Sequence, residues 1–96
     1  MAVDVEWQDE GGKTLEVYGG PPLTWDVLKT APAGTACVRF IDPCGDTTFN
    51  QRQIEELVLE LEAWANAVSS PTLRHLATFA KRARGHVHTY LKFVGD

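Results

Sequence analysis

Two consecutive helices are predicted by the stretch NQRQIEELVLELEAWANAVSSPTLRHLATFAKRARG, residues 50–85. Asn50 and Gln53 have the spacing of a capping box, and Ser70 before Pro71 is a typical helix start. Apolar residues recur at helical spacing in both halves, at Ile54, Leu57, Val58, Leu61, Ala65 and Val68 and then at Leu73, Leu76, Ala77, Ala80 and Ala83. The stretch therefore predicts an antiparallel helical hairpin that buries one face.

Strands are predicted on both sides of this hairpin. After it, residues 87–94 alternate between polar and apolar, as a half-buried strand does. Before it, residues 46–49 predict a short strand, which the turn sequence at residues 42–45, Asp-Pro-Cys-Gly, connects to residues 36–41. The run at 36–41, ACVRFI, is apolar on both faces, which is typical of a central strand.

The first third of the chain predicts a strand hairpin and a short helix. Residues 3–7 and 15–18 alternate on either side of turn residues, which is the pattern of a β-hairpin. A helix over residues 25–30, with Thr24 as its cap, is so short that docking of Trp25 and Leu28 must stabilise it.

The whole chain is thus predicted to be a single α+β domain over residues 1–96. Its expected architecture is an antiparallel sheet of about five strands with a two-helix hairpin on one face. The expected element order is β-β-(short α)-β-β-α-α-β.

Composition excludes several classes of protein. Hydrophobic residues make up 44% and charged residues 23% of the chain, which is ordinary globular usage. No apolar run approaches the roughly 20 residues of a membrane span. The acidic N-terminus does not resemble a signal peptide, so a cytoplasmic location is expected. Cys37 and Cys44 lie far apart along the predicted strand and turn, which predicts free thiols.

Charge is distributed unevenly along the sequence. Residues 1–70 hold twelve acidic and four basic residues, whereas residues 71–96 hold five basic residues and one acidic residue. The acidic majority argues against nucleic acid and is compatible with a basic protein partner, or simply with two solvated faces. The residues predicted to bind a partner are Glu55, Glu56, Glu60 and Trp64, although Trp64 is also a candidate for the core.

A small-ligand site is the second hypothesis. Arg39 lies in the predicted central strand, opposite Phe49 in the expected register, where it needs a carboxylate or an anionic ligand. Its expected neighbours in a ligand site are Tyr90 and Lys92, with the carboxylates Asp42 and Asp46 beside the turn. Asp42 has the simpler alternative of bonding the amides of its own turn, and Asp46 that of a solvated strand start.

Motifs for catalysis and metal binding are not found in the sequence. His86 and His88 are two residues apart on the predicted strand, but no third ligand stands at a recognisable spacing, so a surface pair is expected and no metal is assigned. No catalytic residue and no cofactor is predicted. An enzyme is therefore the third hypothesis only.

Two short stretches resemble known sequences. Arg39-Phe40-Ile41-Asp42-Pro43-Cys44-Gly45-Asp46-Thr47-Thr48-Phe49-Asn50 and the ending Tyr90-Leu91-Lys92-Phe93-Val94-Gly95-Asp96 look like a group of small bacterial proteins of unassigned function. The resemblance implies a bacterial origin and carries no catalytic residue.

The preferred interpretation of the sequence is a non-enzymatic protein-interaction module. An immunity protein, an antitoxin or an accessory subunit is its most concrete form. The alternatives are a small-ligand or metal-binding domain and a small enzyme. Membrane association is not predicted, and self-association into a homodimer is left open because the basic end complements the acidic helix.

Overall fold

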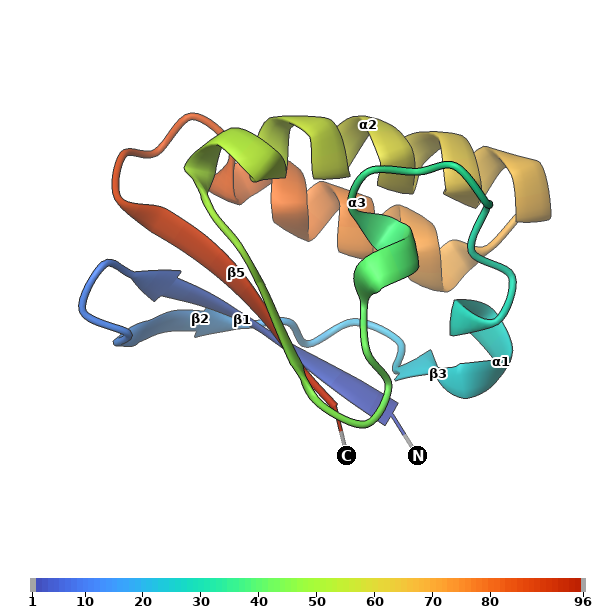
Figure 1. Ribbon diagram of the computed structural model, residues 1–96, viewed down its shortest axis with the longest axis horizontal. Helices are drawn as coiled ribbons and strands as arrows, with labels where there is room; N and C mark the ends of the chain where they lie inside the picture. The colour runs from blue at the N-terminus through green and yellow to red at the C-terminus, as the bar shows by residue number, and fades with distance from the viewer. Residues whose placement is uncertain (1, 96) are drawn as a thin grey trace.

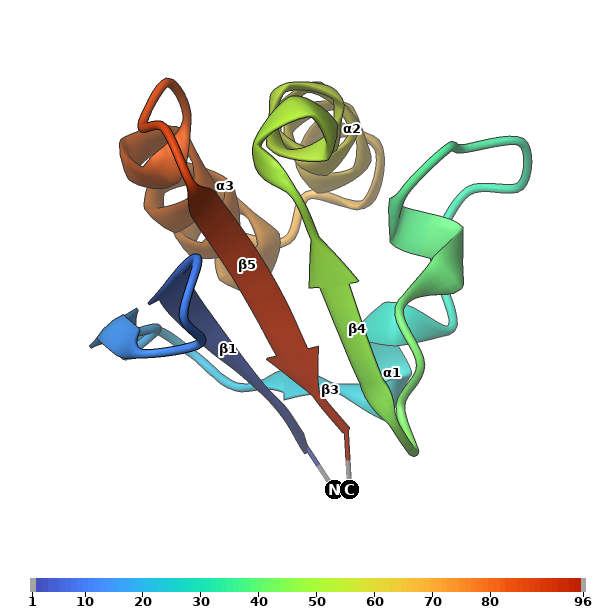
Figure 2. The ribbon, with the colours of Figure 1, turned by 60° about the vertical axis from the view of Figure 1, so that its left-hand side comes forward.

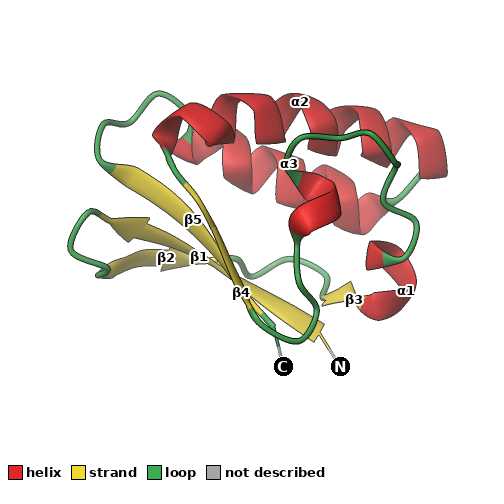
Figure 3. Ribbon diagram, in the orientation of Figure 1, coloured by secondary structure: helices red, strands yellow, loops and turns green. Residues whose placement is uncertain are grey.

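The computed structural model describes residues 2–95 and confirms the predicted α+β fold. An antiparallel sheet forms one layer and two long helices form the other (Figures 1 and 3). The elements follow one another as β1 (Ala2–Asp9), β2 (Thr14–Val17), β3 (Leu23–Thr24), α1 (Trp25–Leu28), the 3₁₀ helix η1 (Val38–Phe40), β4 (Asp46–Phe49), α2 (Gln51–Val68), α3 (Pro71–Ala83) and β5 (Thr89–Val94).

The sheet has five strands in the order β2-β1-β5-β4, with the two-residue strand β3 paired to the start of β1. The C-terminal strand β5 lies between β1 and β4 and pairs with both in an antiparallel manner, as Figure 2 shows. Phe93 is opposite Val5 on one side and Thr47 on the other, and these residues share the face that α2 and α3 cover. The residues between them along the strands point to the open face.

The helical hairpin forms as the sequence predicts. The Asn50 side chain accepts a hydrogen bond from the Gln53 N–H at 3.0 Å, and the Gln53 side chain accepts from the Asn50 N–H at 2.9 Å. Ser70 caps α3 and Pro71 occupies its first turn. Every inward position named above is buried except Val68, which lies in the last turn of α2. Local sequence signals thus define both helices.

One predicted strand is wrong. Residues 36–41 do not join the sheet, and Val38–Phe40 form the 3₁₀ helix η1 against α2. Cys37, Val38 and Ile41 are buried, so the apolar run docks as a short helical turn. The turn at residues 42–45 does form, but it connects η1 to β4. The partner of β4 is therefore β5, which is far away in sequence.

The N-terminal hairpin forms, and smaller differences concern the short helix and the last strand. The helix α1 ends at Leu28, and Trp25, which was expected to dock, is 53% exposed. Thr24 occupies the N-cap position without a side-chain cap bond. The last strand begins at Thr89, because His88 has a positive φ of 55° that interrupts the extended chain.

Within residues 2–95, the helices are too short or too polar to cross a membrane.

Candidate functional site

Trp64 is part of the core and is not a surface anchor. Its side chain is 0% exposed, and its indole N–H donates to the Thr30 hydroxyl at 2.9 Å. The hypothesis that Trp64 contacts a partner is therefore wrong. The residue occupies the inner side of α2, one turn after the buried Leu61, where the indole fills the space between the helix and the segment that follows α1.

Glu60 is committed to a contact within the chain. Its carboxylate accepts backbone N–H groups of Ala36 at 2.7 Å, Cys37 at 2.9 Å and Val38 at 3.0 Å. These amides precede and begin η1, where no backbone carbonyl of a longer helix is present to accept them. Glu60 therefore fixes the 36–41 segment on α2, and the prediction that it binds a partner gives way to a structural role.

Glu55 and Glu56 lie on the outer side of α2, as expected for residues that meet a partner. Both are exposed, and within residues 2–95 neither makes an ion pair. Leu59 is one turn further along the helix and is 59% exposed. Residues three and four apart are neighbours on a helix surface, so Leu59 stands between Glu55 and Glu56 on one side and Glu62 on the other.

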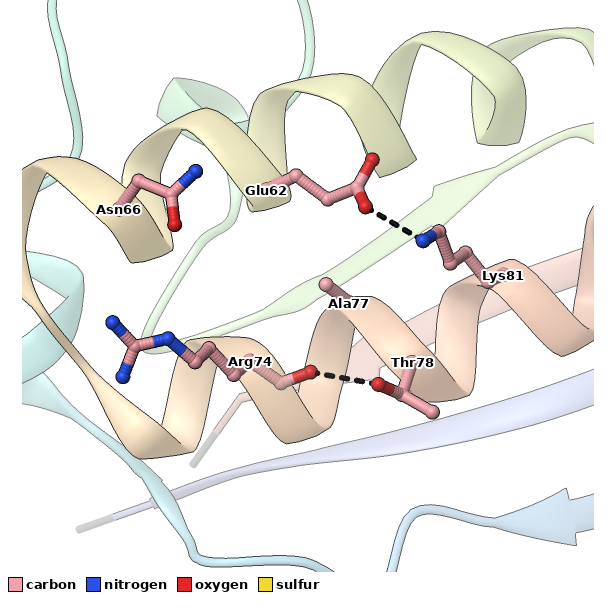
Figure 4. Close-up of a pocket in the computed structure, with 6 residues that line it drawn as sticks. All are labelled: Glu62, Asn66, Arg74, Ala77, Thr78 and Lys81. Carbon is pink, nitrogen blue, oxygen red and sulfur yellow. Dashed lines mark hydrogen bonds and ion pairs between the residues drawn. The ribbon is translucent and has the colours of Figure 1, made fainter.

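The outer face continues into a groove between α2 and α3 (Figure 4). Glu62 pairs with Lys81 at 2.7 Å across the groove, and Arg74 and Asn66 lie at the end nearest the connection of the two helices. The groove has a volume of about 200 Å³. Within the groove Glu62 is paired with Lys81, whereas Arg74 supplies a guanidinium at the other end; Glu55 and Glu56 lie outside the groove, toward the start of α2.

Three of the five residues predicted to bind a ligand meet on the open face of the sheet. Lys92 of β5 pairs with Asp46 of β4 at 3.4 Å, and Tyr90 lies two residues before Lys92 on the same face. Glu6 lies opposite Lys92 on β1. The result is a flat surface of mixed charge in which the ammonium group already has a carboxylate partner.

Arg39 and Asp42 do not join that surface. Arg39 is exposed in η1, and its guanidinium lies 4.5 Å from the centroid of the Phe40 ring, so the predicted position opposite Phe49 is wrong. The physical reason is the loss of the predicted strand. The Asp42 carboxylate accepts the Cys44 N–H at 2.8 Å, which confirms its simpler reading as a turn residue.

The histidines and cysteines do not form a reactive cluster. His86 packs edge-on against Trp7 at 5.2 Å, whereas His88 pairs with Glu10 at 3.1 Å. Over residues 2–95, His, Cys, Asp and Glu side chains form no group of three or more that could hold a metal ion. Both cysteines are free; Cys44 is exposed, and burial raises the pKa of the Cys37 thiol to about 11, with Glu60 and Glu56 adding to the shift.

Sequence reasoning missed Leu59 and Arg74, the two residues that most distinguish the outer helical face. Leu59 had a usable signal, because it is a large apolar residue that lies off the buried stripe of an otherwise polar helix side. Arg74 had none, since its place beside Asn66 depends on how the two helices pair.

Comparison with known proteins gives no relative: no protein family, curated protein or solved structure matches the chain. The resemblance to small bacterial proteins therefore remains a prediction. The structure brings its two stretches together, because β4 pairs with β5 and the Gly95 N–H donates to the Gly45 carbonyl at 2.8 Å. The last residue of the second stretch, Asp96, lies outside the described residues.

Proposed function

We propose that this protein is a non-enzymatic module that binds another protein through the outer face of the α2–α3 hairpin. The observation that carries the proposal is Leu59, which is 59% exposed near the middle of an 18-residue helix. Carboxylates lie one turn away on both sides of it. A leucine in this position loses contact with water only when another surface covers it.

The energetic argument combines an apolar anchor with charge. Burying a fully exposed leucine side chain contributes about 1.5–3 kcal/mol, and more than half of the Leu59 side chain is still available for burial against a partner. Glu55 and Glu56 form no ion pair within residues 2–95, although the basic side chain of Arg52 lies one turn before them on α2. Such charges favour a basic partner and speed its association. The partner class is therefore a basic protein that presents an apolar residue to Leu59.

The two ends of the α2–α3 surface differ in charge. Glu62 is already neutralised by Lys81, so the free carboxylates are concentrated toward the start of α2. Arg74 and Asn66 supply hydrogen-bond donors at the other end. A partner with a basic and an acidic end therefore docks in one orientation, since the reverse orientation opposes like charges.

A neutralising role is the most concrete form of this function. A small acidic protein that covers a basic toxin, as an immunity protein or antitoxin does, needs only a rigid binding face. The rigid, capped helix α2 supplies such a face. An accessory subunit of a larger assembly has the same requirement.

Affinity capture with matched variants tests the proposal. Wild-type protein, Leu59→Asp and the control Val87→Asp are used to capture partners from a lysate of the source organism, because Val87 is an equally apolar side chain that is 70% exposed elsewhere. The expected result is one basic protein, captured by the wild type and the control and lost with Leu59→Asp. Capture that Leu59→Asp leaves unchanged would contradict the proposal.

A charge pair of variants separates the role of α2 from a general effect of net charge. Glu55→Lys with Glu56→Lys changes the net charge as much as Asp4→Lys with Asp26→Lys, but only the first pair alters α2. We expect the first pair to abolish capture at low salt and the second to leave it intact. Equal losses would show that overall acidity, rather than the α2 surface, attracts the partner.

A further inference from the structure

A second surface feature lies on another side of α3, and it shares the lining residue Thr78 with the groove between α2 and α3. It is a hollow of about 580 Å³ between α3 and the segment that connects β2 to β3. Tyr18, Gly19 and Gly20 line one wall, and His75, Phe79 and Arg82 line the other. Its volume is in the range of small-molecule sites, about 300–1,000 Å³.

Two aromatic rings, one from each side of the hollow, pack against each other. Tyr18 and Phe79 meet edge to face with their centroids 5.7 Å apart, and Phe79 is almost fully buried. The Tyr18 hydroxyl donates to the Pro21 carbonyl at 2.8 Å, with the Thr72 carbonyl at 3.4 Å. The hydroxyl lies so close to Gly20 that a Cβ there would approach it to 2.5 Å. The ring is therefore held in place before any ligand arrives.

Arg82 gives the hollow a cationic edge that already holds a carboxylate. Its guanidinium lies 5.4 Å from the centroid of the Phe79 ring. Both of its terminal nitrogens donate to the Glu16 carboxylate, one of them at 3.0 Å, and this contact raises the pKa of Arg82. Glu16 projects from the edge strand β2 toward α3, and both side chains are about half exposed, so external solutes reach the pair.

We propose that the hollow binds a small aromatic carboxylate, with its ring against Tyr18 and its carboxylate on Arg82 in place of Glu16.

The chemistry of the two walls favours this class of ligand. An aromatic ring gains an edge-to-face contact with Tyr18 that an aliphatic ring does not gain, and the buried Phe79 packs against Tyr18 and holds its ring in place. The two terminal nitrogens of Arg82 both donate to Glu16, so a ligand carboxylate that binds this edge of the guanidinium in a bidentate manner must displace Glu16. His75, which lies one helical turn before Phe79 on α3, adds a further donor at the rim. Glu16 thus acts as an internal competitor for the anion position.

Titration followed by amide NMR tests the assignment with phenylacetate as the probe. Saturable shifts are expected at Gly19, Gly20 and Phe79. Cyclohexylacetate, which lacks the aromatic ring, and phenylacetamide, which lacks the charge, are expected to bind at least about fivefold more weakly. The absence of saturable shifts at these residues with phenylacetate would overturn the proposal.

Two substitutions distinguish a ligand contact from a structural role. Arg82→Gln and Glu16→Gln break the same ion pair, so a purely structural effect changes phenylacetate affinity in the same direction in both. The proposal predicts opposite changes: Arg82→Gln weakens binding about fivefold, and Glu16→Gln strengthens it severalfold because the guanidinium becomes free. Arg84→Gln is the matched control and is expected to change nothing. Changes of the same sign in the first two variants would contradict the proposal.

Binding of the tripeptide Ala-Ala-Phe with a free C-terminus shows whether the carboxylate in the hollow belongs to a small molecule or to the end of a polypeptide. Weaker binding of the tripeptide than of phenylacetate supports a small-molecule ligand. Tighter binding would assign the hollow to a chain terminus and overturn the small-molecule assignment.

Discussion

The helical hairpin and residues 18–45 are stabilised in different ways. The hairpin carries its own signals, since its caps lie within a few residues of the helices they start. Residues 18–45 have little regular structure and depend on side chains from distant parts of the chain, among them Glu60 and Trp64 of α2 and Thr47 of β4. Thus α2 both builds the core and fixes the loop beside it, and its outer face is the side that stays exposed.

The largest loss of stability is expected from a change at Trp64, which connects the two regions through Thr30. Trp64→Ala should lower the free energy of unfolding by about 4 kcal/mol, because it leaves a large cavity and removes the hydrogen bond to Thr30. Urea denaturation followed by circular dichroism measures this change. Trp25→Ala is the control, and because that residue is 53% exposed, its effect should be about 0.5 kcal/mol. Equal effects would show that Trp64 does not join the two regions.

The next largest effect is expected from Glu60. Glu60→Ala leaves three backbone N–H groups without their carboxylate and should cost about 2–3 kcal/mol. Glu56→Ala, one turn earlier on the same helix, should change stability by less than about 0.5 kcal/mol. Urea denaturation of both variants measures the difference. A Glu60 variant as stable as the Glu56 variant would mean that the 36–41 segment folds without help from α2.

The close contact between Gly95 and Gly45 also connects residues 18–45 to the rest of the fold. A Cβ at Gly95 would lie 2.5 Å from the backbone N and O atoms of Gly45, so the turn of the irregular region packs directly on β5. Gly95→Ala should therefore cost about 2 kcal/mol through overpacking. Gly19 is the control, because a Cβ there meets no atom within 4 Å, and Gly19→Ala should be neutral within about 0.5 kcal/mol. Thermal unfolding of both variants would show whether the turn and β5 are as closely packed as described.

The smallest effect is expected from alkaline pH. Burial raises the pKa of Cys37 from 9.0 to about 11, so between these values the unfolded chain ionises its thiol while the folded protein keeps the proton. The free energy of unfolding is therefore unaffected by this thiol below pH 9 and falls as pH rises toward 11. Urea denaturation at pH 8 and pH 10 measures the fall. Cys37→Ala should reduce the pH dependence, whereas Cys44→Ala should leave it unchanged.

The sequence predicted those parts of the fold that local signals define. Capping residues and apolar periodicity gave both helices, and alternation gave the last strand and the N-terminal hairpin. The run at residues 36–41 misled because apolar residues on both sides of a short segment suit a buried strand and a docked 3₁₀ turn equally well. The deciding group, the Glu60 carboxylate, stands more than twenty residues away.

The candidate site was predicted only in part, for a related reason. Glu55 and Glu56 are exposed as expected, whereas Glu60 and Trp64 face the interior of the protein. All four residues lie on one helix, and composition alone does not show which carboxylate meets a backbone amide. The groove at Arg74 and Asn66 depends on the pairing of two helices, which periodicity does not define.

The most direct test is amide hydrogen exchange at Ala36, Cys37 and Val38 in the wild type and in Glu60→Ala, which removes both acceptor oxygens, whereas glutamine would keep one of them. We expect protected amides in the wild type and a loss of protection at these three positions in the variant, while the amides of α2 remain protected. Unchanged protection in the variant, or unprotected amides in the wild type, would contradict the claim that Glu60 holds this segment and is therefore unavailable to a partner.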